Sequence, residues 1–219
     1  MSEPIQTIQA DVVIAGSGPG GATTALELAK KGKKVILCEA GKYHQRLGQS
    51  TFMLLGMMDN MGLTFSKEGT WVLRPKTAGG ASVVYCGTAV RPPPWLKEKY
   101  GIDLDEEVDD LYKEIPISTL PDHLVGPAAS TIMQAAQDIG HDWNLIDKWI
   151  RPEKCLQNCG KCSLGCPTGA KWTAREYIEE AKQHGAQLLL KTKVDRVLTE
   201  SGKAVGVRAK GPQGWMDIL

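Results

Sequence analysis

The stretch from residue 11 to residue 41, DVVIAGSGPGGATTALELAKKGKKVILCEAG, most constrains how this chain can fold. The apolar run Val12–Ala15 is short enough for a buried parallel strand. A glycine-rich turn follows, then a helical pattern over residues 22–31, and then a second apolar run at residues 35–38. This order of strand, turn, helix and strand predicts the start of a Rossmann-like parallel sheet.

The turn itself reads GSGPGG and contains the spacing G-x-G-x-x-G. Gly16 permits the tight turn, Gly18 lets the backbone approach a pyrophosphate, and Gly21 lets the helix pack close to the strand. The helix N-terminus offers unpaired N–H groups and the positive end of a dipole to the phosphates. The predicted phosphate-binding residues are therefore Gly16, Gly18, Pro19, Gly20 and Gly21.

An acidic residue, Glu39, ends the second apolar run, and Ala40 follows it. A carboxylate at this position can accept hydrogen bonds from both ribose hydroxyls, and its charge disfavours a 2′-phosphate. A lone G-x-G-x-x-G is weak evidence, whereas strand, glycines, helix, strand and acid in register are strong evidence. We predict a nucleotide site; the alternative is a glycine-rich turn in an ordinary α/β domain.

The composition is that of an ordinary globular protein, with 42% hydrophobic and 23% charged residues in 219. The net charge is +1 without a long basic run, so nucleic acid is not an expected partner. No stretch approaches the length of a membrane span, and no secretion signal is visible. Six cysteines without such a signal favour thiols or metal ligands in a reducing compartment. We expect a cytoplasmic protein, with peripheral membrane association as an alternative.

Residues 155–172, CLQNCGKCSLGCPTGAKW, carry a second chemical signal. Thiolates packed this closely repel one another unless a cation or a cluster neutralises them. The spacing C-x3-C-x2-C-x3-C-P is similar to that of iron–sulfur runs, with one extra residue in the first gap. We predict an iron–sulfur cluster of the 4Fe–4S type; a zinc site and free thiols or disulfides are the alternatives. The predicted ligands are Cys155, Cys159, Cys162 and Cys166.

Two further stretches allow more than one interpretation. Four of the seven methionines fall between residues 52 and 61, which favours a core helix over a pliable channel wall or partner surface. The sequence TAGGAS at residues 77–82 is a second glycine-rich turn, where backbone can approach a flat or charged ligand, or a simple turn between strands. The four histidines are scattered and none sits in a recognisable nucleophile or ligand pattern, so we predict that none of them is catalytic.

Together these stretches resemble the glucose–methanol–choline (GMC) family of FAD-dependent oxidoreductases. The resemblance is carried by the first block above, by TAGGASVVYCGTAVRPP, and by GCPTGAKWTAREYIEEAKQHGAQLLLKTKVDRVL. Cysteines ahead of GAKWTA look like the long-chain alcohol oxidase or dehydrogenase branch. The resemblance implies that Gly16, Gly18, Gly21 and Glu39 bind the ADP half of FAD.

The resemblance also implies contacts along the rest of the cofactor. Gly79, Gly80 and Ser82 would lie along the pyrophosphate and flavin, and the Val194 backbone would meet adenine. Family members with covalent flavin have a histidine in the second block; here that block has none, which implies non-covalent FAD. Residues 85–86 are Tyr-Cys where many members carry Asn, so the contacts near the flavin are expected to differ.

The implied fold class is α/β, a Rossmann-like FAD-binding parallel sheet with a β-meander and a small helical, cysteine-rich insertion. Residues 1–94 would form the first part of the FAD-binding domain, residues 95–172 the insertion, and residues 173–219 the second part. The family's C-terminal half supplies a flavin-binding strand, a substrate-domain sheet and a His–His or His–Asn pair, which this sequence lacks. We expect the fold to be incomplete without a second polypeptide carrying that half.

The resemblance implies an oxidoreductase that acts on the CH–OH group of a small alcohol by hydride transfer to flavin N5. A partner chain would supply the catalytic base, and the cluster would pass electrons to a protein or quinone acceptor. The alternatives are a non-catalytic electron-transfer flavoprotein subunit and an inactive truncated fragment.

Overall fold

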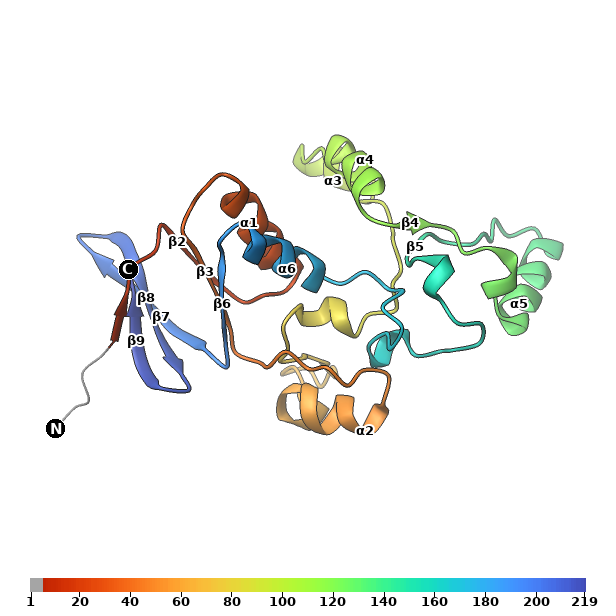
Figure 1. Ribbon diagram of the computed structural model, residues 1–219. Helices are drawn as coiled ribbons and strands as arrows, with labels where there is room; N and C mark the ends of the chain where they lie inside the picture. Colours follow the sequence, from red (N-terminus) through yellow and green to blue (C-terminus); the bar gives the residue numbers. More distant parts are fainter. Residues whose placement is uncertain (1–5) are drawn as a thin grey trace. The chain divides into compact units, whose positions relative to one another are not determined.

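The computed structural model describes residues 6–219, which form two compact units. The first unit combines the residues up to Val84 with Thr173–Leu219, and the second unit is Tyr85–Trp172. Figure 1 shows the elements of both units along the chain. None of the helices in residues 6–219 is long and apolar enough to cross a membrane.

A parallel sheet of three strands organises the first unit. Its strands are β2 (Val12–Ala15), β3 (Val35–Glu39) and β6 (Gln187–Leu190), in the order β2-β3-β6. The predicted βαβ start is confirmed, because β2 and β3 pair in parallel. Every residue of β3 is buried, whereas β2 is only half-buried, since β2 lies at the edge of this sheet in the described residues. The apolar run Val12–Ala15 therefore forms the predicted parallel strand, but this strand is half-buried in the described residues.

Two helices cover one face of that sheet, α1 (Pro19–Lys30) and α6 (Arg175–Gln183), and they lie side by side (Figure 1). The buried positions of α1 are Ala22, Ala25, Leu26 and Ala29, which recur at helical spacing and form one apolar stripe. Three of these four side chains are alanines, so the helix can approach its neighbours closely.

A four-stranded sheet packs against the other face of the parallel sheet. Its order is β1-β9-β8-β7, and its strands are β1 (Gln6–Ile8), β7 (Lys193–Glu200), β8 (Lys203–Gly211) and β9 (Gly214–Ile218). The β-meander is confirmed, with Ser201 and Gly202 in the left-handed turn that joins β7 to β8. Ala209 and Ile218 of this sheet share one core cluster with Ile36 of β3. The first unit therefore has three layers.

The methionine-rich stretch forms α2 (Ser50–Phe52), a π-helical turn η1 (Met53–Met57) and a 3-10 turn η2 (Asp59–Gly62). Met53, Met57 and Met58 are buried, as a core segment requires, but Met61 is 56% exposed. A single helix does not form, because Met58 is extended (φ −75°, ψ 140°) and Asn60 and Met61 adopt positive φ.

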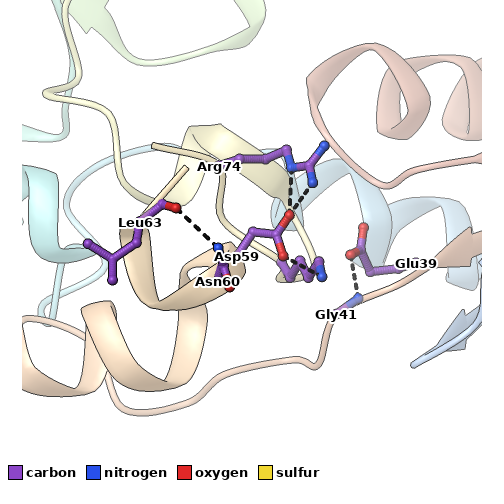
Figure 2. A network of polar contacts seen from close by, with 7 residues as sticks. Glu39, Gly41, Asp59, Asn60, Leu63 and Arg74 are labelled. Atoms are coloured by element: carbon purple, nitrogen blue, oxygen red, sulfur yellow. Dashed lines mark hydrogen bonds and ion pairs between the residues drawn. The ribbon is translucent and has the colours of Figure 1, made fainter. Parts of the chain in front are cut away.

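One carboxylate fastens this stretch to the chain that follows it. Asp59 pairs with Arg74 and lies 2.5 Å from Lys76 Nζ, and the Asn60 side chain donates to the carbonyl of Leu63 (Figure 2). The two cations hold the pKa of Asp59 down, at about 2. Asp59 thus connects η2 to the segment that leads into the second glycine-rich turn.

The second unit consists of short helices, a two-stranded sheet and long loops. Its helices are α3 (Trp95–Tyr100), α4 (Asp105–Glu114) and α5 (Pro127–Asp138), with 3-10 turns η4 (Asp122–Leu124), η5 (Pro152–Lys154) and η6 (Cys162–Leu164). Strands β4 (Ile117–Ser118) and β5 (Lys148–Trp149) pair antiparallel. The centres of the Trp149 and Trp172 rings lie 5.1 Å apart, and Ile150, the residue after Trp149, is buried.

Candidate functional site

The loop between β2 and α1 is built for close backbone approach. Gly16 has φ +96°, and a Cβ at Gly21 would lie 2.0 Å from the Gly16 carbonyl oxygen. A Cβ at Gly18 or Gly20 would meet nothing within 4 Å, so both glycines face open space. No side chain caps α1 and its first turn carries no acid, which leaves the helix N-terminus available to an anion.

The Glu39 carboxylate lies buried at the end of β3 and accepts three hydrogen bonds. Its Oε2 accepts from Ser17 N (3.1 Å) and Ser17 Oγ (2.6 Å), and its Oε1 accepts from Gly41 N (2.7 Å; Figure 2). A carboxylate offers about four acceptor positions. One position on Oε1 is therefore left for an outside donor such as a ribose hydroxyl. The adjacent Ala40 is exposed.

The second glycine-rich turn lies directly against the first. It ends in the 3-10 turn η3 (Gly80–Val83). A Cβ at Gly80 would lie 2.8 Å from the Gly18 Cα, and the N–H of Gly79 donates to Ser17 Oγ at 3.3 Å. The structure therefore brings together two glycine-rich segments that are far apart in the sequence.

The predicted contact residue Ser82 lies in the same turn, but its hydroxyl is engaged within the protein. Ser82 Oγ donates to the Gly79 carbonyl at 2.5 Å and accepts from Ala174 N at 2.9 Å. Because the hydroxyl proton is already used, Ser82 fixes the shape of the turn and could meet a flavin only as an acceptor.

A buried arginine, Arg175, binds this turn through hydrogen bonds, and the sequence did not indicate it as a site residue. Arg175 is buried and donates to the carbonyls of Ala78 (2.9 Å) and His44 (2.8 Å) and to Thr77 Oγ1 (2.9 Å). Its guanidinium also lies 4.4 Å from the centre of the Tyr43 ring. Arg175 follows directly after the WTA of the third block, and nothing in its spacing indicated burial.

The last predicted nucleotide contact is Val194, which follows closely on a segment that is hydrogen-bonded to Glu39. Thr192 N donates to the Glu39 carbonyl at 2.8 Å, and Val194 follows two residues later in β7. Pairing between β7 and β8 shifts register between Val194 and Arg196. Val194 itself stays paired with Ala209, and Asp195 is the residue that leaves the regular ladder.

The four predicted metal ligands lie together in the second unit. Cys155, Cys159, Cys162 and Cys166 line one cavity of about 350 Å³, and Lys148, Lys161 and Lys171 also line it. All four are free thiols. Among residues 6–219, no group of three or more His, Cys, Asp or Glu side chains is arranged to hold a single metal ion.

The protein surroundings act differently on the individual thiols. Burial raises the pKa of Cys155, and the neighbouring Cys166 and Cys159 raise it further. Burial also raises the pKa of Cys162, against the opposing charge of Lys171. Burial alone would raise the pKa of Cys166 as well, but hydrogen bonds from Thr168 Oγ1 (3.3 Å) and from nearby backbone N–H groups lower it. The Cys166 thiol therefore loses its proton more readily than an ordinary cysteine.

The sequence analysis also missed Lys171, which is 2% exposed. Its Nζ donates to the carbonyls of Tyr85 (2.6 Å) and Cys162 (2.7 Å) and lies 4.6 Å from the centre of the Tyr85 ring. Burial lowers the pKa of Lys171 to about 8. Lysines are seldom buried this completely, and no pattern around GAKW marks this one.

Comparison with known proteins places this site in a family context. The family model described as GMC oxidoreductase matches residues 11–217. An uncharacterised GMC-type oxidoreductase of Mycobacterium tuberculosis is 29% identical over 96% of this chain and 36% of its own length. A long-chain-alcohol oxidase of Arabidopsis thaliana is 26% identical over 94% of this chain and 30% of its own length. The chain thus spans about a third of the length of these curated relatives.

Solved structures share the fold at low sequence identity. The crystal structure of pyridoxine 4-oxidase from Mesorbium loti has a TM-score of 0.70 and 16% identity, over 99% of this chain and 48% of that one. Formate oxidase has a TM-score of 0.63, again at 16% identity.

Proposed function

Because the chain belongs to the GMC oxidoreductase family, we propose that it is the FAD-binding part of an enzyme that oxidises a CH–OH group. The observation that carries this proposal is the convergence of the two glycine-rich turns and the buried Glu39 carboxylate in the first unit. The similar Arabidopsis protein is named a long-chain-alcohol oxidase, which supports an alcohol as the substrate class.

The residues of the first unit fit FAD held without a covalent bond. Loop 16–21 and the N-terminus of α1 would bind the pyrophosphate, and Glu39 Oε1 would accept from the ribose. Bound FAD supplies the hydride acceptor for the alcohol carbon. We assign no catalytic base in this chain and propose that a second polypeptide with the C-terminal GMC half provides it.

We further propose that the four cysteines of the second unit hold an iron–sulfur cluster. A cluster places iron and sulfide between its thiolates, so its ligands lie farther apart than the ligands of one ion. Four thiols on one cavity, with backbone N–H groups near Cys166, fit that demand for space and for hydrogen bonds to the thiolates. Such a cluster supplies one-electron transfer toward a protein or quinone acceptor.

The flavin proposal is tested by purifying the chain together with its native partners and precipitating it with acid. We expect flavin to be released as FAD into the supernatant in stoichiometric amount. Flavin that stays on the polypeptide would show a covalent bond, and a preparation that takes up no FAD on reconstitution would contradict the cofactor assignment itself.

The cluster proposal is tested by anaerobic expression followed by measurement of iron, sulfide and zinc. We expect iron and sulfide in the wild type, and Cys162→Ser should lose or convert the cluster while FAD stays bound. Cys86→Ser is the matched control, because Cys86 is an exposed free thiol that does not line the cavity. Stoichiometric zinc without iron would overturn the proposal.

A further inference from the structure

The buried ammonium of Lys171 has no part in the proposed chemistry so far. We propose that Lys171 is the counter-cation and structural bracket of the four-cysteine site: its charge offsets the thiolates, and its hydrogen bonds hold the Cys162 turn. This inference rests on the proposed cluster and assigns a positioning role to a residue that is not a ligand.

The structural role of Lys171 rests on two hydrogen bonds within the second unit. Lys171 Nζ joins the carbonyl of Cys162, on the cysteine loop, to the carbonyl of Tyr85, more than seventy positions earlier in the chain. The stem is enclosed as well, since a Cβ at Gly87 would lie 3.3 Å from Lys171 Cδ. A fixed stem and two carbonyl acceptors leave the ammonium little freedom to leave the cavity wall.

The counter-cation role follows from position and burial. Lys171 lines the same cavity as the four cysteines, and Cys162, Cys166 and Cys86 are the thiols that act on it electrostatically. Lys161 lines the cavity too but is exposed, so water screens its charge. A buried charge acts through a lower effective dielectric and is felt more strongly at the same distance. Lys148 is partly buried, so its charge is screened less than that of Lys161 and more than that of Lys171.

A cation beside a cluster stabilises its more reduced state, because reduction adds negative charge to the site. Removing the Lys171 charge should therefore make the midpoint potential more negative. Lys171→Gln keeps an N–H donor for the carbonyls but removes the charge, and Lys171→Arg keeps the charge. Lys161→Gln removes an exposed charge from the same cavity and serves as the control.

The experiment uses the full chain, purified anaerobically with the partners it retains, and measures iron content and midpoint potential by dithionite titration. For Lys171→Gln we expect at least a tenfold fall in the one-electron reduction equilibrium, which corresponds to 59 mV. Lys171→Arg and Lys161→Gln should stay close to the wild type. A folded Lys171→Gln that loses its iron, while Lys161→Gln keeps it, would also support the proposal.

Two results would overturn the inference, and they are distinguishable. Wild type without iron and sulfide would remove the proposed cluster and this inference with it. Wild type with a cluster, but Lys171→Gln with the same iron content and potential as Lys161→Gln, would remove the inference alone. If circular dichroism shows that Lys171→Gln does not fold, Lys171→Arg decides: a folded Arg variant with wild-type potential supports the role, and a folded one without iron contradicts it.

Discussion

The Glu39 carboxylate stabilises the folded loop even without a ligand. It is 7% exposed, and all three of its donors come from Ser17 and Gly41. A buried carboxylate without such donors would be strongly destabilising. The residue that we propose accepts from a ribose therefore also fixes the loop that would meet the pyrophosphate, so folding and the proposed cofactor binding share one side chain.

Replacing Glu39 with Gln should damage both properties. One amide NH₂ must face either the N–H of Gly41 or the donors of Ser17, so donor meets donor at a buried position. We expect a loss of about 1–3 kcal/mol in the free energy of unfolding and at least about a tenfold rise in the FAD dissociation constant. Urea denaturation and flavin titration measure the two effects. Asp11→Asn is the control, because Asp11 also accepts from a backbone N–H (Lys34, 2.8 Å) but is exposed.

His44 gives the first unit a pH dependence with a defined sign. Its buried Nδ1 lies 3.1 Å from Thr77 Oγ1, and burial lowers its pKa, with Arg175 and Lys42 adding to the effect. The unfolded chain therefore binds the proton first, so stability is fully present above the ordinary histidine pKa of about 6.5 and falls as the pH drops below it. Urea midpoints between pH 8 and pH 5 should show this loss.

The pH effect has its own control. His44→Gln should flatten the dependence in that range, whereas His184→Gln should leave it in place, since His184 is exposed at the end of α6. An unchanged slope in the His44 variant would assign the effect to another group.

Among the elements, the turn at residues 77–80 depends on close contacts from several directions. Gly79 has φ +89°, and a Cβ there would lie 2.9 Å from Arg175 Cγ and 3.0 Å from Val83 Cγ2. Gly69 has nearly the same conformation, φ +83°, but a Cβ there would meet nothing within 4 Å. The chain thus offers a pair of glycines that separates backbone strain from steric overlap.

We expect Gly69→Ala to cost only the left-handed strain, about 1–2 kcal/mol. Gly79→Ala should add about 1–3 kcal/mol for the overlap and should weaken FAD, because the turn packs on the Gly18 loop. Thermal denaturation and flavin titration of both variants test this. Equal losses in the two variants would mean that the turn relaxes freely and does not shape the site.

Elements whose sequence pattern is local were predictable, and elements that depend on distant partners were not. β2, β3 and the β7–β8 hairpin follow from short apolar runs, alternating strands and a Ser-Gly turn. The pairing of β1 with β9 joins the two ends of the described chain and has no local signal. The methionine stretch was predicted as one helix, because neither its π-helical turn nor the extended Met58 after it has a local sequence signal.

The site shows the same division. Glycine spacing and Glu39 marked the loop that we propose binds the nucleotide, since each residue type there has one physical task. The burial of Arg175 and Lys171 was not predicted, because long cationic side chains usually lie at the surface. Only the structure shows the carbonyl groups that accept their hydrogen bonds. The four cysteines were recognisable by number and spacing, but the burial of Lys171 beside their cavity depends on Tyr85 and Gly87, far earlier in the chain.

For the whole molecule, the open edge of β2 is the feature with the largest consequence. Val12 N donates to Lys34, just before β3, and Gly16 N donates to Cys38 of β3, so alternation along the strand directs the N–H groups of Val13 and Ala15 to the opposite edge. No strand in residues 6–219 pairs with that edge. An apolar edge of this kind is an aggregation hazard unless another strand covers it. We propose that the second polypeptide supplies that strand, through an obligate interface above about 2,000 Å².

Ala15→Pro tests this proposal with little disturbance elsewhere, because Ala15 is exposed and its N–H points away from β3. Proline removes that donor, whereas the control Ala15→Thr keeps the donor and favours a strand. Expressed alone, the wild-type chain should aggregate or lack flavin; co-expressed with a GMC C-terminal half, it should form a soluble, flavin-bearing pair. Size-exclusion chromatography with light scattering should show that pair for Ala15→Thr and lose it for Ala15→Pro. A monodisperse monomer of the chain alone, fully loaded with FAD, would contradict the two-chain assembly, because the β2 edge would then need no partner.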